Sequence, residues 1–317
     1  MFLIERKKED GFEKIILRDQ NSGAAAEILP SSGAILHAFT VKKDERVINV
    51  IDSYSSKDDF LENVTSAGFK GCKLSPFVCR VKNATYSFGE NQYKLEKFIQ
   101  NGDALHGELY DKPFEIMGEL ADESGASVTM KYHYDKEDPG YPFTYDCIVT
   151  YKLESDQKLR VTTECLNLDE GLIPMLDGWH PYFSLGDKID ELHLEFQSME
   201  MVEFENLIPS GKMKEYDTFN SLKKIGDTVF DNCFTLNLET CQPMCVLRNV
   251  TEKIQVELYP SESYPYLQIY TPDHRKSIAI ENLSGVPDAF NNAMGFQTIE
   301  PGQSSIYEVV YKIALLK

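Results

Sequence analysis

The feature that most constrains the fold of this chain is a two-residue alternation of apolar and polar side chains, repeated in many short segments. Successive side chains of a β-strand point to opposite faces of the sheet, so this alternation is typical of strands with one buried face. Residues 128–134 carry apolar or aromatic side chains at even positions and polar side chains at odd positions. The alternation recurs in residues 145–154, 159–165, 192–197, 254–258 and 307–313.

Turn signals separate these segments, among them Asp-Pro-Gly at residues 138–140 and Pro-Ser-Gly at residues 209–211. Helical signals are confined to two short stretches, residues 56–61 and 221–224. Many short half-buried strands with few helices between them indicate an antiparallel sandwich or barrel. We expect an all-β protein, a large antiparallel β-sandwich with few short helices. Because no low-complexity linker interrupts the chain, we expect a single domain over residues 1–317.

Composition excludes several classes of function. The chain has 317 residues, of which 42% are hydrophobic and 26% charged, which is typical of a soluble globular protein. Its net charge of −19 argues against a nucleic-acid partner, because the phosphate backbone would be repelled. No apolar run approaches the ~20 residues that a membrane-spanning helix needs, so we expect no membrane partner.

The cysteines indicate a reducing environment. There are seven, and no two have the Cys-x-x-Cys spacing of a zinc or redox site. An odd, scattered set predicts reduced thiols, as in cytoplasmic proteins. The apolar run at the N-terminus is too short for a signal peptide, which also favours a cytoplasmic location.

Four of the six histidines are weak candidates for chemistry. Strand alternation places His133 and His193 on polar faces, which predicts that both are exposed to solvent. His274 lies in a Pro-Asp-His-Arg turn, which usually forms a solvated loop tip. His37 lies in a mixed apolar stretch and is expected to be half-buried.

Two histidines and one carboxylate remain. His180 lies in the aromatic segment 179–183, where it could be a proton-transfer group or a core histidine bonded to the backbone. His106 precedes Gly107 and could be a simple turn residue. Glu281 shares a strand face with a small alanine, opposite two isoleucines, so it could line a concave surface or end an exposed strand. Partial burial would raise the pKa of Glu281 toward that of a useful general base.

Several collinear segments resemble the aldose 1-epimerase (galactose mutarotase) family. They are the Gly-x-x-Leu-x-x-Phe element in residues 32–39, a Pro-Phe-x-x-Arg segment in 71–80, Leu-His-Gly in 101–107, Gly-Tyr-Pro in 138–142, His-Pro-Tyr-Phe in 180–183, an aspartate segment in 230–234, and Gly-Val-Pro-Asp-Ala-Phe-Asn within 280–291. The chain departs from the family pattern at Cys79, where asparagine is usual, and at Asn282, where proline is usual. The resemblance implies that the predicted β-sandwich is of the large type called a supersandwich.

The resemblance also implies a reaction, the interconversion of the α and β anomers of a free aldohexose. The ring opens, rotates about C1–C2 and closes again, which needs one base and one acid. The resemblance assigns the base to Glu281 and the acid to His180, with the roles exchanged on closure. It requires neither a metal nor an organic cofactor.

The remaining site residues follow from the same resemblance. Arg80 and His106 would hold the sugar and favour negative charge on its oxygens. Asp231 would accept hydrogen bonds from sugar hydroxyls. Tyr182 is a candidate apolar wall, as are Trp179 and Phe183, although strand alternation cannot place all three on one face.

Four alternatives stay open. A non-catalytic carbohydrate-binding or sugar-sensing protein of the same fold would need no acid–base pair. A β-sandwich glycoside hydrolase could use Glu281 and Asp231 as its two carboxylates. The His-Gly-Glu motif at residues 106–108 suggests a cupin-like metal protein, although the sequence shows no set of three metal ligands that would converge. A sugar-phosphate 1-epimerase would call for several cations, and Arg80 alone favours an unphosphorylated aldose.

The identity of the preferred sugar depends on the geometry of hydroxyl contacts, which the spacing of residues along the chain does not contain. The partner is expected to be a small-molecule aldose, and the protein to be a monomer or a homodimer.

Overall fold

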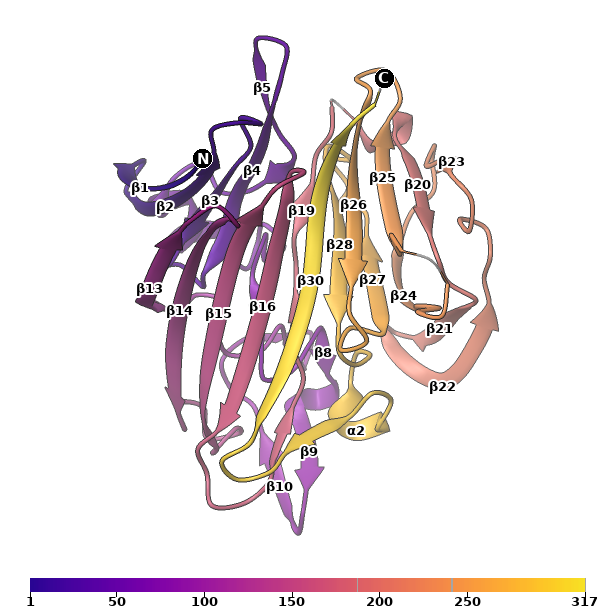
Figure 1. Cartoon of the computed structure of the whole chain (residues 1–317). Helices are drawn as coiled ribbons and strands as arrows, with labels where there is room; N and C mark the ends of the chain where they lie inside the picture. Colours follow the sequence, from indigo (N-terminus) through magenta and orange to yellow (C-terminus); the bar gives the residue numbers. More distant parts are fainter. Residues whose placement is uncertain (187, 241, 317) are drawn as a thin grey trace.

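The computed structural model describes residues 1–186, 188–240 and 242–316, and it consists mainly of antiparallel strands (Figure 1). Two large sheets and a smaller N-terminal sheet contain most of the strands. This architecture confirms the predicted all-β antiparallel sandwich. Cys241, one of the seven cysteines expected to be reduced, lies outside the described residues.

The first large sheet contains the longest strands, which lie at the front of Figure 1. In spatial order its strands are β13 (Glu115–Ala121), β14 (Ala126–Asp135), β15 (Thr144–Glu154), β16 (Lys158–Asn167), β30 (Ser304–Leu315), β26 (Ile254–Pro260), β25 (Cys245–Asn249), β20 (His193–Phe196) and β23 (Lys223–Lys224). In β16, buried and half-buried side chains alternate over the whole strand, as the sequence pattern predicts.

The second large sheet lies behind the first. Its main path is β22 (Ile208–Glu215), β21 (Glu200–Glu205), β24 (Asp231–Thr235), β27 (Tyr266–Tyr270), β28 (Ile278–Leu283), β18 (Gly178–Trp179) and β7 (Lys73–Leu74), and β19 (Tyr182–Phe183) joins β28 to β6 (Ile51–Asp52). All six side chains of β28 are buried, so this strand is covered on both faces.

The remaining strands form smaller sheets. The N-terminal sheet contains β1 (Phe2–Glu9), β2 (Phe12–Asp19), β3 (Ala25–Leu29), β4 (Ile35–Lys43) and β5 (Arg46–Asn49). Three further groups are β11 (Ile99–Gln100), β12 (Asp103–Leu105) and β8 (Arg80–Val81); β10 (Asn91–Lys94) and β9 (Thr85–Phe88); and β17 (Ile173–Met175) with β29 (Gln297–Ile299).

Helices are short in the described part of the chain. They are α1 (Lys57–Asn63) and α2 (Ala289–Asn292), with 3₁₀ turns at Lys82–Ala84 and Ile189–Glu191. The helix expected at residues 56–61 is confirmed as α1, whose first turn is capped by the Ser56 hydroxyl accepting from the Asp59 N–H. Neither described helix has the length and apolar character needed to cross a bilayer.

The second expected helix, at residues 221–224, is wrong. Lys223 and Lys224 form β23 instead, paired with His193 and Leu194 at the edge of the first sheet. A four-residue stretch makes too few helical hydrogen bonds to offset the free-energy cost of helix nucleation. Pairing with the edge of the first sheet is therefore the more stable arrangement.

One hydrophobic core connects the three larger sheets. It contains Leu17 from the N-terminal sheet, Tyr145 and Tyr151 from the first large sheet, and Phe234 and Ile280 from the second. Each fully buried side chain of this size contributes roughly 1.5–3 kcal/mol relative to an exposed one. This packing fixes the second sheet, whose strands β24, β27 and β28 carry a polar pocket.

Candidate functional site

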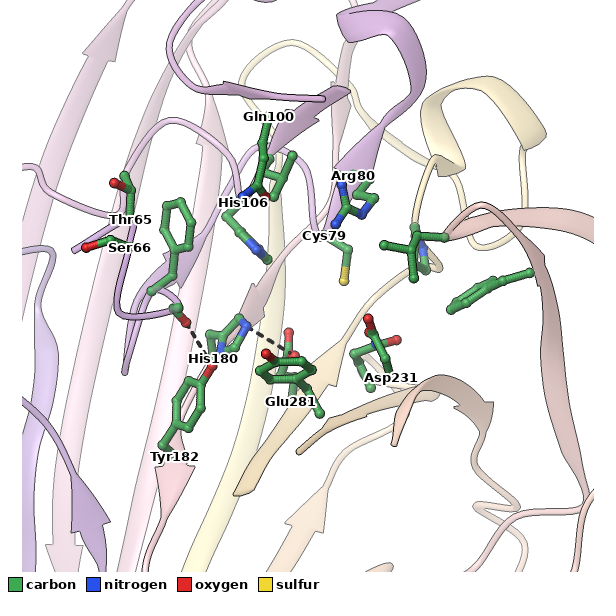
Figure 2. Close-up of a pocket in the computed structure, with 18 residues that line it drawn as sticks. Thr65, Ser66, Cys79, Arg80, Gln100, His106, His180, Tyr182, Asp231 and Glu281 are labelled. Carbon is green, nitrogen blue, oxygen red and sulfur yellow. Dashed lines mark hydrogen bonds and ion pairs between the residues drawn. The ribbon is translucent and has the colours of Figure 1, made fainter. Parts of the chain in front are cut away.

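A pocket of about 300 Å³ opens over strands β24, β27 and β28 of the second sheet (Figure 2). Pairing between these strands sets which side chains face it. Gln268 lies directly opposite Glu281, and Asp231 lies directly opposite Tyr270. Opposed residues of an antiparallel pair share one face, so these four side chains line the same wall of the pocket.

All six residues proposed from the sequence line this one pocket, although they are far apart in the chain. They are Arg80, His106, His180, Tyr182, Asp231 and Glu281. His180 directly follows β18, and its neighbour strand β28 carries Glu281. Arg80 begins β8, and His106 directly follows β12, the strand that pairs with β8.

His180 and Glu281 face each other at the base of the pocket. The His180 Nε2 atom lies 3.3 Å from the Glu281 Oε1 atom, and the two side chains are 6% and 2% exposed. The other polar atom of each, His180 Nδ1 and Glu281 Oε2, is buried with no hydrogen-bond partner among the described residues. Buried polar atoms are nearly always paired, so these two unpaired atoms are candidates for contact with a bound ligand.

Burial separates the proton affinities of this pair. It lowers the pKa of His180 to about 4, because the charged imidazolium is poorly solvated there. It raises the pKa of Glu281 well above its ordinary value, and the nearby Asp231 carboxylate raises it further. These opposite shifts favour the proton on Glu281 over His180, and the two groups lie close enough for proton transfer.

His106 occupies the upper wall in an unusual backbone conformation, with φ of +62°. Its N–H donates to the Cys79 carbonyl at 2.8 Å, and its ring lies between Phe69 and His180, with centroids 4.5 and 5.1 Å away. Burial, followed by His180 and Arg80, lowers the pKa of His106 well below its usual range. His106 is therefore a neutral imidazole in the pocket wall.

Gly107 is required for this wall. Its φ of +74° falls where side chains are disfavoured, and a Cβ atom would lie 2.4 Å from the Ser75 carbonyl oxygen. The Leu-His-Gly element therefore places His106 by bringing two backbone segments closer than any side chain would permit.

Arg80 and Asp231 occupy the side of the pocket opposite Tyr182 (Figure 2). The nearest carboxylate oxygen to the Arg80 guanidinium belongs to Asp103, at 3.8 Å, too long for a hydrogen bond. The Asp231 Oδ1 atom accepts from the Gln268 Nε2 atom at 3.0 Å. Burial raises the pKa of Asp231, and the Arg80 charge partly opposes that rise.

Tyr182 supports the catalytic candidate His180. The two rings stack with centroids 5.2 Å apart and planes 17° apart, and the Tyr182 hydroxyl donates to the Gly68 carbonyl at 3.0 Å. The expectation that Trp179 or Phe183 also forms a wall is wrong. Both point into the core, where their ring centroids lie 5.8 Å from Tyr151 and 5.7 Å from Tyr311, because strand alternation turns them away from the face of Tyr182.

The pocket also contains residues that the sequence reasoning did not identify. Gln268 and Tyr270 are the most prominent, and only the pairing of β27 with β24 and β28 shows that they face the site. Cys79, noted only as a departure from the family pattern, lines the pocket with φ of +48°. Burial, followed by Glu281, raises the pKa of its thiol well above the usual range.

The other four histidines lie outside the pocket. His133 and His274 are exposed and His37 is half-buried, as predicted. His193 is half-buried rather than solvent-exposed, because β20 lies between β25 and β23. Among the described residues, no three His, Cys, Asp or Glu side chains are arranged to hold a metal ion.

Fold and site together define a class of β-sandwich protein in which a buried acid–base pair faces a pocket of small-molecule size. Comparison with known proteins narrows that class. The sequence profile of the aldose 1-epimerase family matches residues 14–312. The chain belongs to the aldose 1-epimerase family.

Individual relatives agree with this assignment. The bifunctional protein GAL10 of Kluyveromyces lactis is 25% identical over 280 residues, which cover 80% of this chain and 38% of that protein. The chain thus spans well under half the length of that relative. A galactose mutarotase-like protein from Clostridium acetobutylicum has a similar structure, with a TM-score of 0.86, 17% identity and 99% of both chains covered. A galactose 1-epimerase from Lactobacillus acidophilus has a TM-score of 0.81 and 19% identity, covering 100% of this chain and 99% of that one.

Proposed function

We propose that this protein is an aldose 1-epimerase that interconverts the α and β anomers of a free aldohexose. The observation that carries the proposal is the 3.3 Å contact between His180 and Glu281 at the base of a pocket of about 300 Å³. Ring opening needs an acid and a base in one site, and this contact joins two titratable groups whose pKa values burial shifts in opposite directions.

Ring opening begins when the proton favoured on Glu281 moves across the 3.3 Å contact to His180, which leaves Glu281 as a carboxylate and His180 as the acid. Glu281 removes the proton of the anomeric hydroxyl, and the electron pair of that oxygen forms the carbonyl as the bond from C1 to the ring oxygen breaks. The ring oxygen takes the proton of His180. After rotation about C1–C2, His180 and Glu281 reverse their roles and the ring closes on the other face. Each positioned proton transfer is worth roughly 10²–10⁴-fold in rate.

The remaining pocket residues bind the sugar in this proposal. Arg80 has no hydrogen-bonded carboxylate among the described residues, so its guanidinium is free to hold sugar oxygens that become negative. His106 is neutral, and its Nδ1 atom has no hydrogen-bond partner in the described part of the chain. Asp231 accepts from hydroxyls, and the ring of Tyr182 offers an apolar wall. The chemistry consists of proton transfers alone and requires no cofactor.

An unphosphorylated sugar fits this pocket better than a sugar phosphate. Within the described residues that line it, Arg80 is the single lysine or arginine. A phosphate group carries about two negative charges near neutral pH and is usually held by several cations or backbone donors. The nearby Asp231 and Glu281 carboxyl groups would also disfavour a phosphate.

Polarimetry on freshly dissolved α-glucose and α-galactose tests the proposal. We expect wild-type protein to accelerate the approach to the equilibrium rotation, and His180→Ala and Glu281→Gln to lose that acceleration while remaining folded. His133→Ala is the matched control, since that histidine is exposed and outside the pocket. Sugar binding without acceleration by the wild type would instead support a non-catalytic carbohydrate-binding protein, and release of reducing sugar from a glycoside would support a hydrolase.

We further propose that the whole chain forms one domain, because a single core cluster includes residues from Phe2 to Ile313.

A cytoplasmic location is supported by six described cysteines, all of them buried and unpaired. The net charge of −19 supports a protein that does not bind nucleic acid. The proposed partner is a small-molecule aldose, on which the protein acts as a monomer or a homodimer.

A further inference from the structure

Lys73 and Asp177 form an ion pair that is fully buried behind the pocket. The Lys73 Nζ atom lies 2.5 Å from the Asp177 Oδ2 atom, and both side chains are 0% exposed. Lysine and aspartate are almost never fully buried unless paired. A buried pair of this kind contributes little net stability compared with apolar side chains of similar volume, so its presence calls for another explanation.

The contacts of Asp177 connect the segments that carry His180 and Glu281. The Asp177 N–H donates to the Ser284 hydroxyl at 2.9 Å, and the Ser284 N–H donates back to the Asp177 carbonyl at 2.9 Å. Asp177 is three residues before His180, and Ser284 is three residues after Glu281. The Tyr264 hydroxyl adds a bond of 2.6 Å to the Asp177 Oδ1 atom, so both carboxylate oxygens have a partner.

Lys73 holds the same segment from the other side. Its Nζ atom donates to the Gly178 carbonyl at 3.1 Å and lies 4.5 Å from the centroid of the Trp179 ring. Lys73 is also the register partner of Trp179 in the β7–β18 pair. The ammonium group therefore contacts both residues of β18, the strand that immediately precedes His180.

These contacts matter because the strands at this point are very short. Strands β7 and β18 have two residues each, and β18 pairs with β28 only at Gly178 and Leu283. The backbone of His180 itself makes two bonds, one to Cys72 and one to Gly71. So few ladder bonds give the loop little resistance to a shift of the His180 ring away from Glu281.

We propose that Lys73 and Asp177 are positioning residues that hold His180 at proton-transfer distance from Glu281. Neither side chain lines the pocket, so their effect on the sugar is indirect. The kinetic consequence rests on the proposed aldose 1-epimerase function. Loss of the pair loosens the distance between acid and base, which lowers kcat more than it raises KM.

The first test is the double variant Lys73→Met/Asp177→Asn, which removes both charges together and conserves volume. The introduced amide could still accept from the Tyr264 hydroxyl, and no unpaired charge is left in the core. We expect kcat to fall about tenfold or more, since misplacing reacting groups by ~1 Å can cost about 10²-fold, while KM changes by less than about threefold. A folded double variant with wild-type kcat and KM would show that the pair is merely structural.

A second variant decides the question if the double variant does not fold. Tyr264→Phe removes one hydrogen-bond donor from Asp177 without creating a buried charge. We expect its kcat to fall roughly three- to tenfold, the equivalent of one hydrogen bond. Tyr86→Phe is the matched control, because Tyr86 is also buried and donates to the Gly140 carbonyl at 2.9 Å, away from Asp177. Equal kinetics of the two tyrosine variants would overturn the proposal.

The titration of His180, followed by NMR, tests the positioning role independently of the proposed enzymatic function. A looser His180 gains solvent, so its pKa should rise toward the ordinary value in the double variant and in Tyr264→Phe, and stay unchanged in Tyr86→Phe. That readout needs no catalytic activity. Wild-type protein without mutarotation would overturn the function but leave the NMR test intact, whereas an unchanged His180 titration would overturn the positioning role alone.

Discussion

The His180 Nε2 atom lies 3.3 Å from the Glu281 Oε1 atom, although the two residues are 101 positions apart in the chain. Strand β28 carries Glu281, and the adjacent β18 ends immediately before His180. Both side chains are buried, with 6% of His180 and 2% of Glu281 exposed.

Replacing Glu281 with glutamine should lower kcat/KM by about 10²–10⁴-fold, because the amide cannot accept the anomeric proton. The volume is conserved, so the fold should be retained. Polarimetric rates together with circular dichroism check this expectation. Wild-type rates in a folded Glu281→Gln protein would contradict the role of the carboxylate.

The rate should follow a bell-shaped curve with pH. Activity needs one proton on the pair, since a second proton removes the base and loss of the first removes the acid. Burial lowers the pKa of His180 to about 4, so the acid limb should fall near that pH. The raised pKa of Glu281 places the alkaline limb well above the ordinary range of a carboxyl group. A pH series of kcat/KM on one aldose measures both limbs, and an acid limb at the ordinary pKa of histidine would contradict the buried geometry.

Glu281→Gln should also stabilise the protein, increasingly as pH rises. The folded pKa of Glu281 is raised, so between the unfolded and folded pKa the unfolded chain releases a proton that the folded protein keeps. The free energy of unfolding of the wild type therefore decreases as pH rises from the unfolded-state pKa to the folded-state pKa of Glu281. Glutamine does not titrate, so the variant does not lose stability in this way. Thermal unfolding at pH 5 and pH 8 should show a larger Tm gain for the variant at pH 8; an equal gain at both would argue against a raised pKa.

Gly107→Ala should destabilise the protein more than Gly102→Ala. Both glycines have positive φ, at +74° and +94°, so both substitutions cost backbone strain of roughly 1–3 kcal/mol. A Cβ atom at Gly107 would also lie 2.4 Å from the Ser75 carbonyl oxygen, whereas nothing lies within 4 Å at Gly102. Urea unfolding of the two variants measures the difference. Equal destabilisation would mean that the backbone around His106 is not held as closely as described.

Asp231→Asn should raise KM for the aldose about tenfold or more with a smaller change in kcat, because a hydrogen bond to a charged group is worth about 1.5–3 kcal/mol. Asp231 is bonded to Gln268 and lies beside Glu281 without contacting His180. Steady-state kinetics check the split between KM and kcat. Asp146→Asn, on the first sheet, is a suitable control and should leave both constants unchanged.

The sequence predicted most of the fold because alternation is a local property of the strand. Residues 128–134 and 159–165 form strands β14 and β16 with the predicted faces inward. Local patterns failed where a neighbour decided the outcome. Residues 221–224 pair with a sheet edge instead of forming a helix, and His193 is half-buried because strands flank it on both sides.

The sequence by itself determined the strands, the faces that they bury and the identity of the candidate site residues, since motif order along the chain marks His180 and Glu281. Only the tertiary structure decided that Gln268 and Tyr270 share their pocket, that Trp179 turns into the core, and that the buried pair of Lys73 and Asp177 lies behind His180. The reason is physical. Side-chain alternation repeats every two residues within one strand, whereas pairing and burial join residues more than a hundred positions apart, and no local pattern contains that register.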